Sequence, residues 1–127
     1  MSKILVVDDS RLSLEAIQES LLSRGHELVL TENPLEVPHL IRETHPDLVL
    51  IDLNMPTMRG DVVARIIRKA FGNELVVLLH TEVPEEARAL LEGCAANGVV
   101  AKSADEEVLC DAVALHLAQR TVPARVG

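Results

Sequence analysis

The chain has 127 residues, of which 48% are hydrophobic and 25% are charged, a composition typical of one globular domain. With 20 acidic against 12 basic residues its net charge is −8, so we expect no nucleic-acid-binding surface. No apolar run approaches the roughly 18 residues of a membrane span, and no signal-peptide hydrophobic region is found. We therefore expect a cytoplasmic protein with no membrane partner, with one domain over residues 1–120 and a flexible tail over residues 121–127.

Short apolar runs predict the strands of a parallel sheet. They are continuous rather than alternating, which is typical of strands covered by helices on both faces. The fully apolar runs are residues 4–7, 48–51, 75–79 and 99–101, and a weaker run with one polar end covers residues 27–31.

The segments between these strands have the apolar spacing of helices. The segment 35–44 contains Pro38 in its first turns, so we expect a short or irregular helix there. Pro84 with two following glutamates is typical of a first turn, and Ser103 with Glu106 predicts a capping box that opens the last helix. Five strands that alternate with five helices predict an α/β fold with a doubly wound parallel sheet.

Polar side chains follow most of the predicted strands. Because the carboxyl ends of parallel strands meet at one edge of the sheet, where α/β proteins bind ligands, we expect these side chains to lie together. They are Asp8, Asp9, Asp52, Asn54, His80, Thr81 and Lys102.

Three converging aspartates favour a bound cation, and their hard oxygen ligands favour Mg²⁺. An aspartate beside a divalent cation and a lysine is equipped to accept a phosphoryl group. Any single aspartate after a strand is more often a helix cap or a turn residue. It is the combination of acids and a lysine, each at the end of a separate strand, that indicates a site.

These residues resemble the receiver domain of bacterial response regulators. The resemblance covers residues 3–119, nearly the whole chain, and rests on Val6-Val7-Asp8-Asp9-Ser10, on Asp52-Leu53-Asn54-Met55-Pro56 with Gly60, and on Lys102. It implies a flavodoxin-like sheet in the order 2-1-3-4-5, the order of chemotaxis-type regulators.

The resemblance also implies the roles of the site residues. Asp52 is expected to be phosphorylated by a histidine kinase or a phosphotransfer protein. Mg²⁺ is expected to be held by Asp9, Asp52 and the backbone carbonyl of Asn54, with Asp8 acting through water. Lys102 is expected to pair with the phosphoryl group.

Three positions depart from the family pattern. Members carry Ser or Thr at the end of the fourth strand, where ungapped spacing places His80, and a shift of one residue would place Thr81 there. The usual aromatic residue three positions before the lysine is Val99, and the usual proline after the lysine is Ser103. We leave open whether His80 is a neutral structural replacement or a hydrogen-bond donor to the phosphoryl group.

Two other features have ordinary interpretations. Arg65, Arg68 and Lys69 are predicted on one helix, where a solvated face is a more common explanation than a partner surface. Pro34 and Pro38 are expected only to shape the second helix.

The leading hypothesis is a stand-alone receiver domain that is phosphorylated on Asp52 and signals to an unknown downstream protein. The second is a degenerate receiver that acts as a phosphorylation-independent protein-binding module, as the altered residues suggest. The third is an enzyme that hydrolyses phosphate esters through an aspartyl intermediate. That enzyme would need a second carboxylate two residues after the nucleophile, where Asn54 and Ser10 stand instead, so we expect no enzymatic activity.

Overall fold

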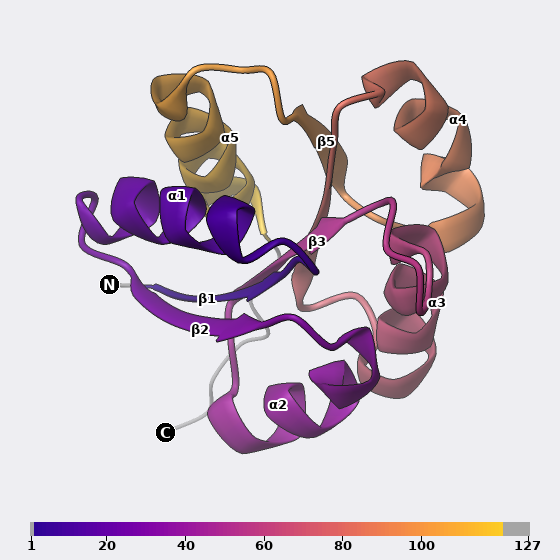
Figure 1. The fold of residues 1–127 in the computed structure, drawn as a ribbon. Helices are drawn as coiled ribbons and strands as arrows, with labels where there is room; N and C mark the ends of the chain where they lie inside the picture. The colour runs from indigo at the N-terminus through magenta and orange to yellow at the C-terminus, as the bar shows by residue number, and fades with distance from the viewer. Residues whose placement is uncertain (1, 121–127) are drawn as a thin grey trace.

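A computed structural model describes residues 2–120 as five parallel strands in one sheet, with the order β2-β1-β3-β4-β5 (Figure 1). The predicted fold class and strand order are therefore confirmed, while the tail predicted over residues 121–127 lies outside the described residues. The strands are β1 (Lys3–Val7), β2 (Glu27–Thr31), β3 (Leu48–Asp52), β4 (Val76–Thr81) and β5 (Gly98–Ala101). The helices are α1 (Arg11–Leu22), the 3₁₀ turn η1 (Pro34–Glu36), α2 (Val37–Thr44), α3 (Gly60–Phe71), α4 (Pro84–Cys94) and α5 (Glu106–Gln119).

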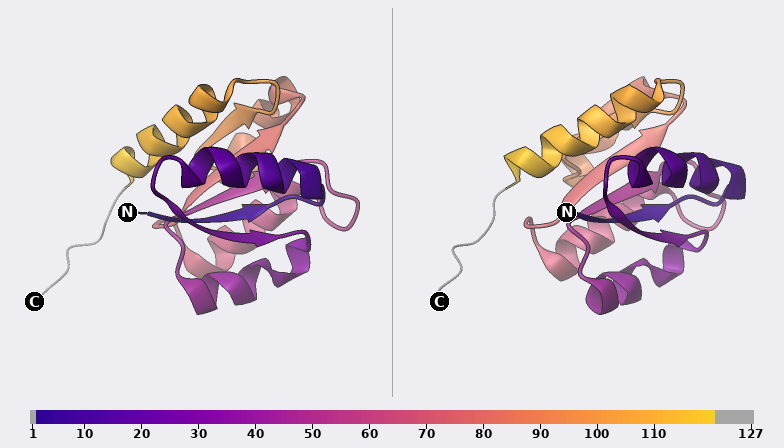
Figure 2. Two further views of the ribbon diagram at one scale, coloured as in Figure 1. Left: turned by 60° about the vertical axis from the view of Figure 1, so that its left-hand side comes forward. Right: turned by 90° about the vertical axis from the view of Figure 1, so that its left-hand side faces the viewer.

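Helices cover both faces of the sheet, as Figure 2 shows, with α1 and α5 on one side and α2, α3 and α4 on the other. Alternate residues of each strand face opposite sides, so each central strand contributes to two cores. β1, for example, places Ile4 and Val6 in one core and Leu5 and Val7 in the other. This double burial explains why the central strands are continuous apolar runs.

The fourth strand is longer than its apolar run. The prediction ended it at Leu79, but β4 continues through His80 and Thr81. The sheet continues because the carbonyls of both residues accept backbone hydrogen bonds, from Leu53 N–H at 3.0 Å and from Lys102 N–H at 2.7 Å. Backbone pairing does not depend on side-chain polarity. The strand predicted from the apolar run therefore ended too early.

The observed beginnings of the helices agree with the predictions from the sequence at two places and differ at a third. Pro84 is in the first turn of α4, and the segment with Pro38 is a 3₁₀ turn followed by a short helix. The capping box predicted at Ser103 is wrong, because α5 begins at Glu106 with Asp105 as its N-cap residue. Residues 101–104 instead form a turn closed by a hydrogen bond from Ala104 N–H to the Ala101 carbonyl.

Over the described part of the chain, we find no helix with both the length and the apolar character to cross a bilayer.

Candidate functional site

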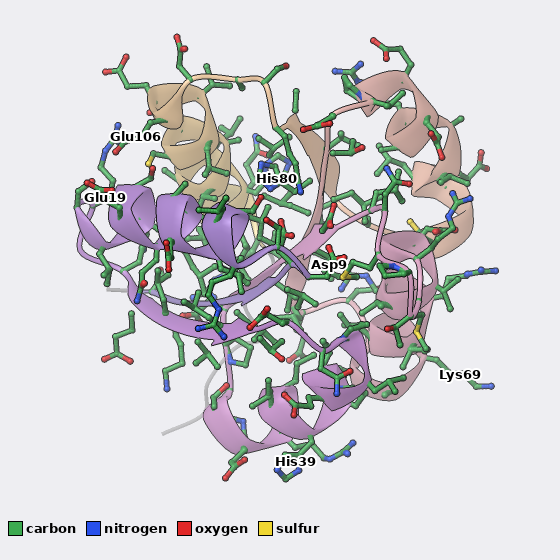
Figure 3. All side chains as sticks on the ribbon, in the orientation of Figure 1. Asp9, Glu19, His39, Lys69, His80 and Glu106 are labelled. Atoms are coloured by element: carbon green, nitrogen blue, oxygen red, sulfur yellow. The ribbon has the colours of Figure 1, made fainter. Side chains whose placement is uncertain are left out.

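Three aspartates meet at the carboxyl ends of two neighbouring strands. Asp8 and Asp9 directly follow β1, and Asp52 is the last residue of β3. One carboxylate oxygen from each lies within 4.8 Å of the others. Asp8 and Asp52 are buried, whereas Asp9, which is labelled in Figure 3, is exposed, so one acid of the cluster is accessible to solvent. The predicted convergence of these acids is confirmed.

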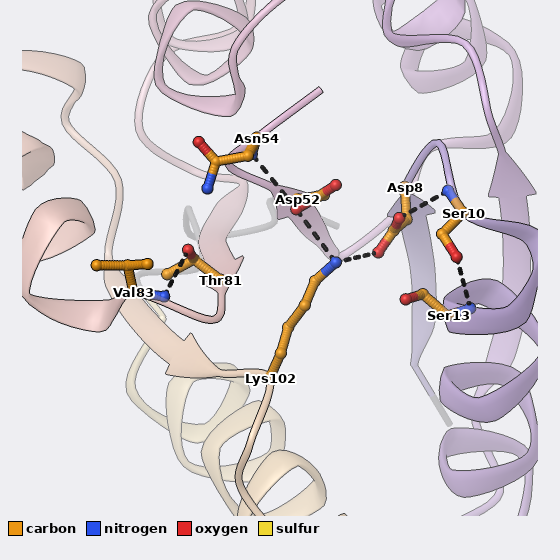
Figure 4. A network of polar contacts seen from close by, with 8 residues as sticks. All are labelled: Asp8, Ser10, Ser13, Asp52, Asn54, Thr81, Val83 and Lys102. Carbon is orange, nitrogen blue, oxygen red and sulfur yellow. Dashed lines mark hydrogen bonds and ion pairs between the residues drawn. The ribbon is translucent and has the colours of Figure 1, made fainter. Parts of the chain in front are cut away.

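Lys102 supplies the positive charge of the cluster. Its ammonium lies 2.9 Å from Asp8 Oδ2 and 3.2 Å from Asp52 Oδ1, so it bridges the two buried carboxylates (Figure 4). The hydrogen bond from Lys102 N–H to the Thr81 carbonyl extends the β4–β5 ladder by one residue. This bond positions the lysine although no proline follows it.

The first turn of α1 orients Asp8. The Ser10 N–H donates to Asp8 Oδ1 at 2.9 Å, and the Ser10 hydroxyl caps the helix by accepting from Ser13 N–H at 3.3 Å (Figure 4). From the sequence, Ser10 was identified only as part of a motif, and this role was missed. A serine between a strand and an apolar helical stripe is the usual signal of an N-cap, and it was available in the sequence.

Burial and the neighbouring charges act in opposite directions on the ionisable groups of the cluster. Burial and the neighbouring Asp8 carboxylate raise the pKa of Asp52 to about 6, although Lys102 acts in the opposite direction. For Lys102, burial favours the neutral amine, but the hydrogen bonds and charges of Asp8 and Asp52 outweigh it and raise its pKa. The lysine is therefore held as a cation, and Asp52 carries a charge that burial disfavours.

His80, rather than Thr81, lies on the side of the sheet that carries the acids. His80 is paired with Asp52 in the β3–β4 register and follows Val76 and Leu78, which pack beneath α1 and α5. Thr81 alternates to the opposite face, where its hydroxyl accepts from Val83 N–H at 3.0 Å (Figure 4). The structure therefore favours His80 at the position where the family has a hydroxyl.

His80 is a buried, neutral side chain. It is 7% exposed, and its Nδ1 has no hydrogen-bond partner among the described residues. Burial and the nearby Lys102 ammonium lower its pKa to about 4, against a smaller opposing effect of Asp8. The imidazole is therefore held in its neutral form, on the strand position paired with Asp52.

The loop after β3 comes close to the site through Asn54 and Gly60. The Asn54 N–H donates to Asp52 Oδ1 at 3.4 Å. A Cβ atom at Gly60 would lie 2.9 Å from the Leu53 Cα and would also clash with the Asp52 carbonyl oxygen. Glycine therefore lets α3 begin directly against the end of β3.

The other altered position, Val99, lies in β5 opposite Leu79 and packs partly buried against the core beneath α2, α3 and α4. It is therefore partly exposed, on the strand next to the one that carries His80. An aliphatic side chain here cannot make the inward and outward ring movement of an aromatic residue.

The residues present fit a magnesium ion. The cluster offers carboxylate oxygens from Asp8, Asp9 and Asp52 within one small region, and hard oxygen ligands with room for water are what Mg²⁺ prefers. Burial and the Asp8 carboxylate together raise the pKa of Asp52 despite the Lys102 ammonium, so its charged form is disfavoured. A divalent cation would compensate for that charge.

Comparison with known proteins agrees with this geometry. The family model of the response regulator receiver domain matches residues 4–114. The chain belongs to this family. It is a receiver domain of the two-component response regulators, and the resemblance of its motifs is confirmed.

The relatives of this receiver domain differ in length. The response regulator MprA of Mycobacterium sp. (strain KMS) is 37% identical over 79 residues, which are 62% of this chain and 34% of MprA. The chain thus spans about a third of the first curated relatives it matches. Protein PilH of Pseudomonas aeruginosa is 29% identical over 93% of this chain and 99% of PilH.

Solved structures share the fold. The chemotaxis response regulator CheY4 of Vibrio cholerae superposes with a TM-score of 0.82 at 24% identity, covering 91% of this chain and 98% of CheY4. At that identity the likeness supports the fold of the receiver domain, and its function must be argued from the site itself.

Proposed function

We propose that this receiver domain accepts a phosphoryl group on Asp52 from a histidine kinase or a phosphotransfer protein, with Mg²⁺ as cofactor. The domain then signals by protein–protein interaction in the cytoplasm. The observation that carries this proposal is the arrangement in which the Lys102 ammonium bridges Asp8 and Asp52 beside the exposed Asp9.

Asp52 supplies the nucleophile. One carboxylate oxygen attacks the phosphorus of the donor, a new O–P bond forms, and the P–N bond to the donor's histidine breaks with the electron pair leaving on the imidazole. Lys102 is within reach to neutralise an oxygen of the transferred group, since it already lies 3.2 Å from Asp52.

A magnesium ion would be held by Asp9, Asp52 and the carbonyl of Asn54, with Asp8 acting through water. The ion would supply further compensation for the negative charge of the phosphoryl oxygens. The chain's own contribution is to hold the ligands together, with Asp8 oriented by the Ser10 N–H at 2.9 Å.

His80 is the distinctive residue of the proposed site. Its neutral ring carries one N–H, and its buried Nδ1 has no partner among the described residues, which supports a role as donor to a phosphoryl oxygen. The alternative is a purely structural replacement. A His80→Thr variant that loses its phosphoryl group at the wild-type rate would favour the structural role.

A phosphorylation-independent binding module is the second candidate. Val99 and His80 favour it, because they replace the aromatic and hydroxyl side chains that the family uses to report phosphorylation. In that case the partner affinity of the wild type would equal that of Asp52→Asn, with and without a phosphodonor. We propose no turnover of small phosphate esters, since Asn54 and Ser10 stand where a second acid would be needed.

The test is the intact mass of the protein after incubation with Mg²⁺ and acetyl phosphate. Gain of one phosphoryl group is expected for the wild type. The gain should be absent in Asp52→Asn and when EDTA replaces the metal. No gain in the wild type, under conditions that label an ordinary receiver domain, would refute the small-donor reaction and leave the binding module as the better account.

A further inference from the structure

An apolar groove lies between the beginning of α2 and the middle of α3, away from the acidic site. Buried side chains of α3, Val63 and Ile67, form its floor. Leu35 of η1 and Ile66 of α3 stand at its edges, and Met58 of the loop after β3 closes one end. The hollow has a volume of about 70 Å³ and is lined almost entirely by apolar atoms.

Two of the apolar side chains that line this α2–α3 groove are exposed. Leu35 is 60% exposed and Ile66 is 37% exposed, on opposite sides of the hollow. A single exposed aliphatic side chain is ordinary on a protein surface. Two of them on either side of an apolar hollow are typical of a groove that receives the apolar face of another segment.

Cations lie one helical turn beyond the groove on both helices. Arg42 follows Pro38 by four residues on α2, and its guanidinium lies 6.0 Å from the centre of the Phe71 ring. Lys69 follows Ile66 by three residues on α3 and points into solvent (Figure 3). Within residues 2–120, neither cation has an acidic side chain at ion-pair distance.

These uncompensated cations are informative because the protein as a whole carries a net charge of −8. An apolar hollow with a cationic end matches an amphipathic segment that carries carboxylates.

We propose that the α2–α3 groove docks a short amphipathic helix of a partner protein. Its apolar side chains enter between Leu35 and Ile66, and its carboxylates pair with Arg42 and Lys69. The prolines at 34 and 38, which the sequence left with an ordinary interpretation, thus line the same surface that Lys69 borders, whereas Arg68 donates to the Ala95 carbonyl at 2.7 Å and Arg65 lies 4.0 Å from Asp61. The proposal does not depend on phosphorylation of Asp52, and its test uses the unphosphorylated protein.

The test is an NMR titration of the ¹⁵N-labelled protein with a designed helical peptide. The peptide carries leucines at positions i, i+4 and i+7 and glutamates at its end, and a matched peptide has lysine at every glutamate. We expect saturable amide shifts confined to residues 35–37, 39–42, 58 and 63–70, the segments that line the groove or carry its cations. We expect the glutamate peptide to bind about tenfold more tightly than the lysine peptide.

Charge reversal provides the second readout. Arg42→Glu and Lys69→Glu are each expected to lower the affinity of the protein for the glutamate peptide about fivefold. Arg88→Glu, at an exposed position of α4, should leave this affinity unchanged. Ile66→Ser should lower the affinity of the protein for both peptides.

Several results would overturn the proposal. They are shifts outside the groove, equal affinities of the two peptides, or no saturable shift at millimolar peptide. Concentration-dependent broadening of the same amides without peptide, removed by Ile66→Ser, would show instead that a second copy of the chain covers the groove.

Discussion

The ammonium of Lys102 lies 2.9 Å from the carboxylate of Asp8, a residue 94 positions earlier in the chain. The lysine leaves the end of β5 and extends past β4 and β3 to reach the residue that follows β1. Along this path it also contacts Asp52 at 3.2 Å. One cation therefore links the ends of three strands, and the balance of charge at this point controls both stability and the proposed chemistry.

Removing the lysine should destabilise the metal-free protein. In Lys102→Ala, the buried Asp8 and Asp52 carboxylates repel each other without a bridging cation, and the free energy of unfolding should fall by about 2–4 kcal/mol. The measurement is urea unfolding in EDTA, with Lys69→Ala as a control at an exposed lysine. Equal losses in the two variants would contradict the bridging role.

Neutralising Asp52 should have the opposite effect. Because burial and Asp8 raise the pKa of Asp52 to about 6, its ionised form costs stability above pH 6. Asp52→Asn should therefore be more stable than the metal-free wild type by about 1–3 kcal/mol at pH 7.5.

The advantage of Asp52→Asn should shrink as the pH falls. Between pH 6 and the ordinary aspartate value of 3.8, the folded wild type binds a proton at Asp52 that the unfolded chain does not. Urea titrations at intervals from pH 7.5 to 4 measure this convergence. A difference that stays constant with pH would mean that Asp52 is not the titrating group.

His80 should make the protein sensitive to acid. Burial lowers its pKa to about 4 from the ordinary value of 6.5, so the unfolded chain binds a proton at this residue before the folded protein does. The stability that the neutral ring contributes is complete above pH 6.5 and is lost as the pH falls toward 4.

The effect of His80 is best measured in the Asp52→Asn background, where the opposing titration of Asp52 is absent. The loss of unfolding free energy between pH 7 and pH 4.5 should be smaller in His80→Asn by up to about 3 kcal/mol. His39→Asn, which changes an exposed histidine on α2, is the matched variant for comparison. The same pH dependence in both histidine variants would count against the buried neutral ring.

Gly60 should tolerate no side chain. In Gly60→Ala, the new Cβ would lie 2.9 Å from the Leu53 Cα, so α3 or the end of β3 must move. We expect a loss of about 1–3 kcal/mol and slower phosphorylation, because the shift reaches Asp52.

A matched glycine provides the control for this variant. Gly93 lies inside α4, and a Cβ atom added there would meet nothing within 4 Å, so Gly93→Ala should stabilise the helix by about 0.5–1 kcal/mol. If Gly60→Ala instead gained stability as Gly93→Ala does, the close approach of α3 to β3 would be wrong.

Much of this protein follows from the sequence by itself. The continuous apolar runs such as residues 48–51 require cover on both faces, which a doubly wound sheet provides. In such a sheet the residues that follow the strands must share one edge, so Asp8, Asp9, Asp52 and Lys102 could be placed together before the structure was known.

Only the tertiary structure decided two further points. One is where a strand ends, which depends on backbone pairing, and the other is which face of the sheet a side chain takes, which depends on the alternation of residues along the strand. Apolar patterning cannot show that β4 continues through His80 and Thr81, because the ladder is made by carbonyl and amide groups that every residue has. That continuation fixes which face each side chain takes, and so it places His80 on the side of the acids and Thr81 on the other. The α2–α3 groove likewise depends on how Leu35 and Ile66, from separate elements, pack across the sheet face. Local patterns predict the elements and their shared edge, whereas register and packing between distant segments are set by the whole fold.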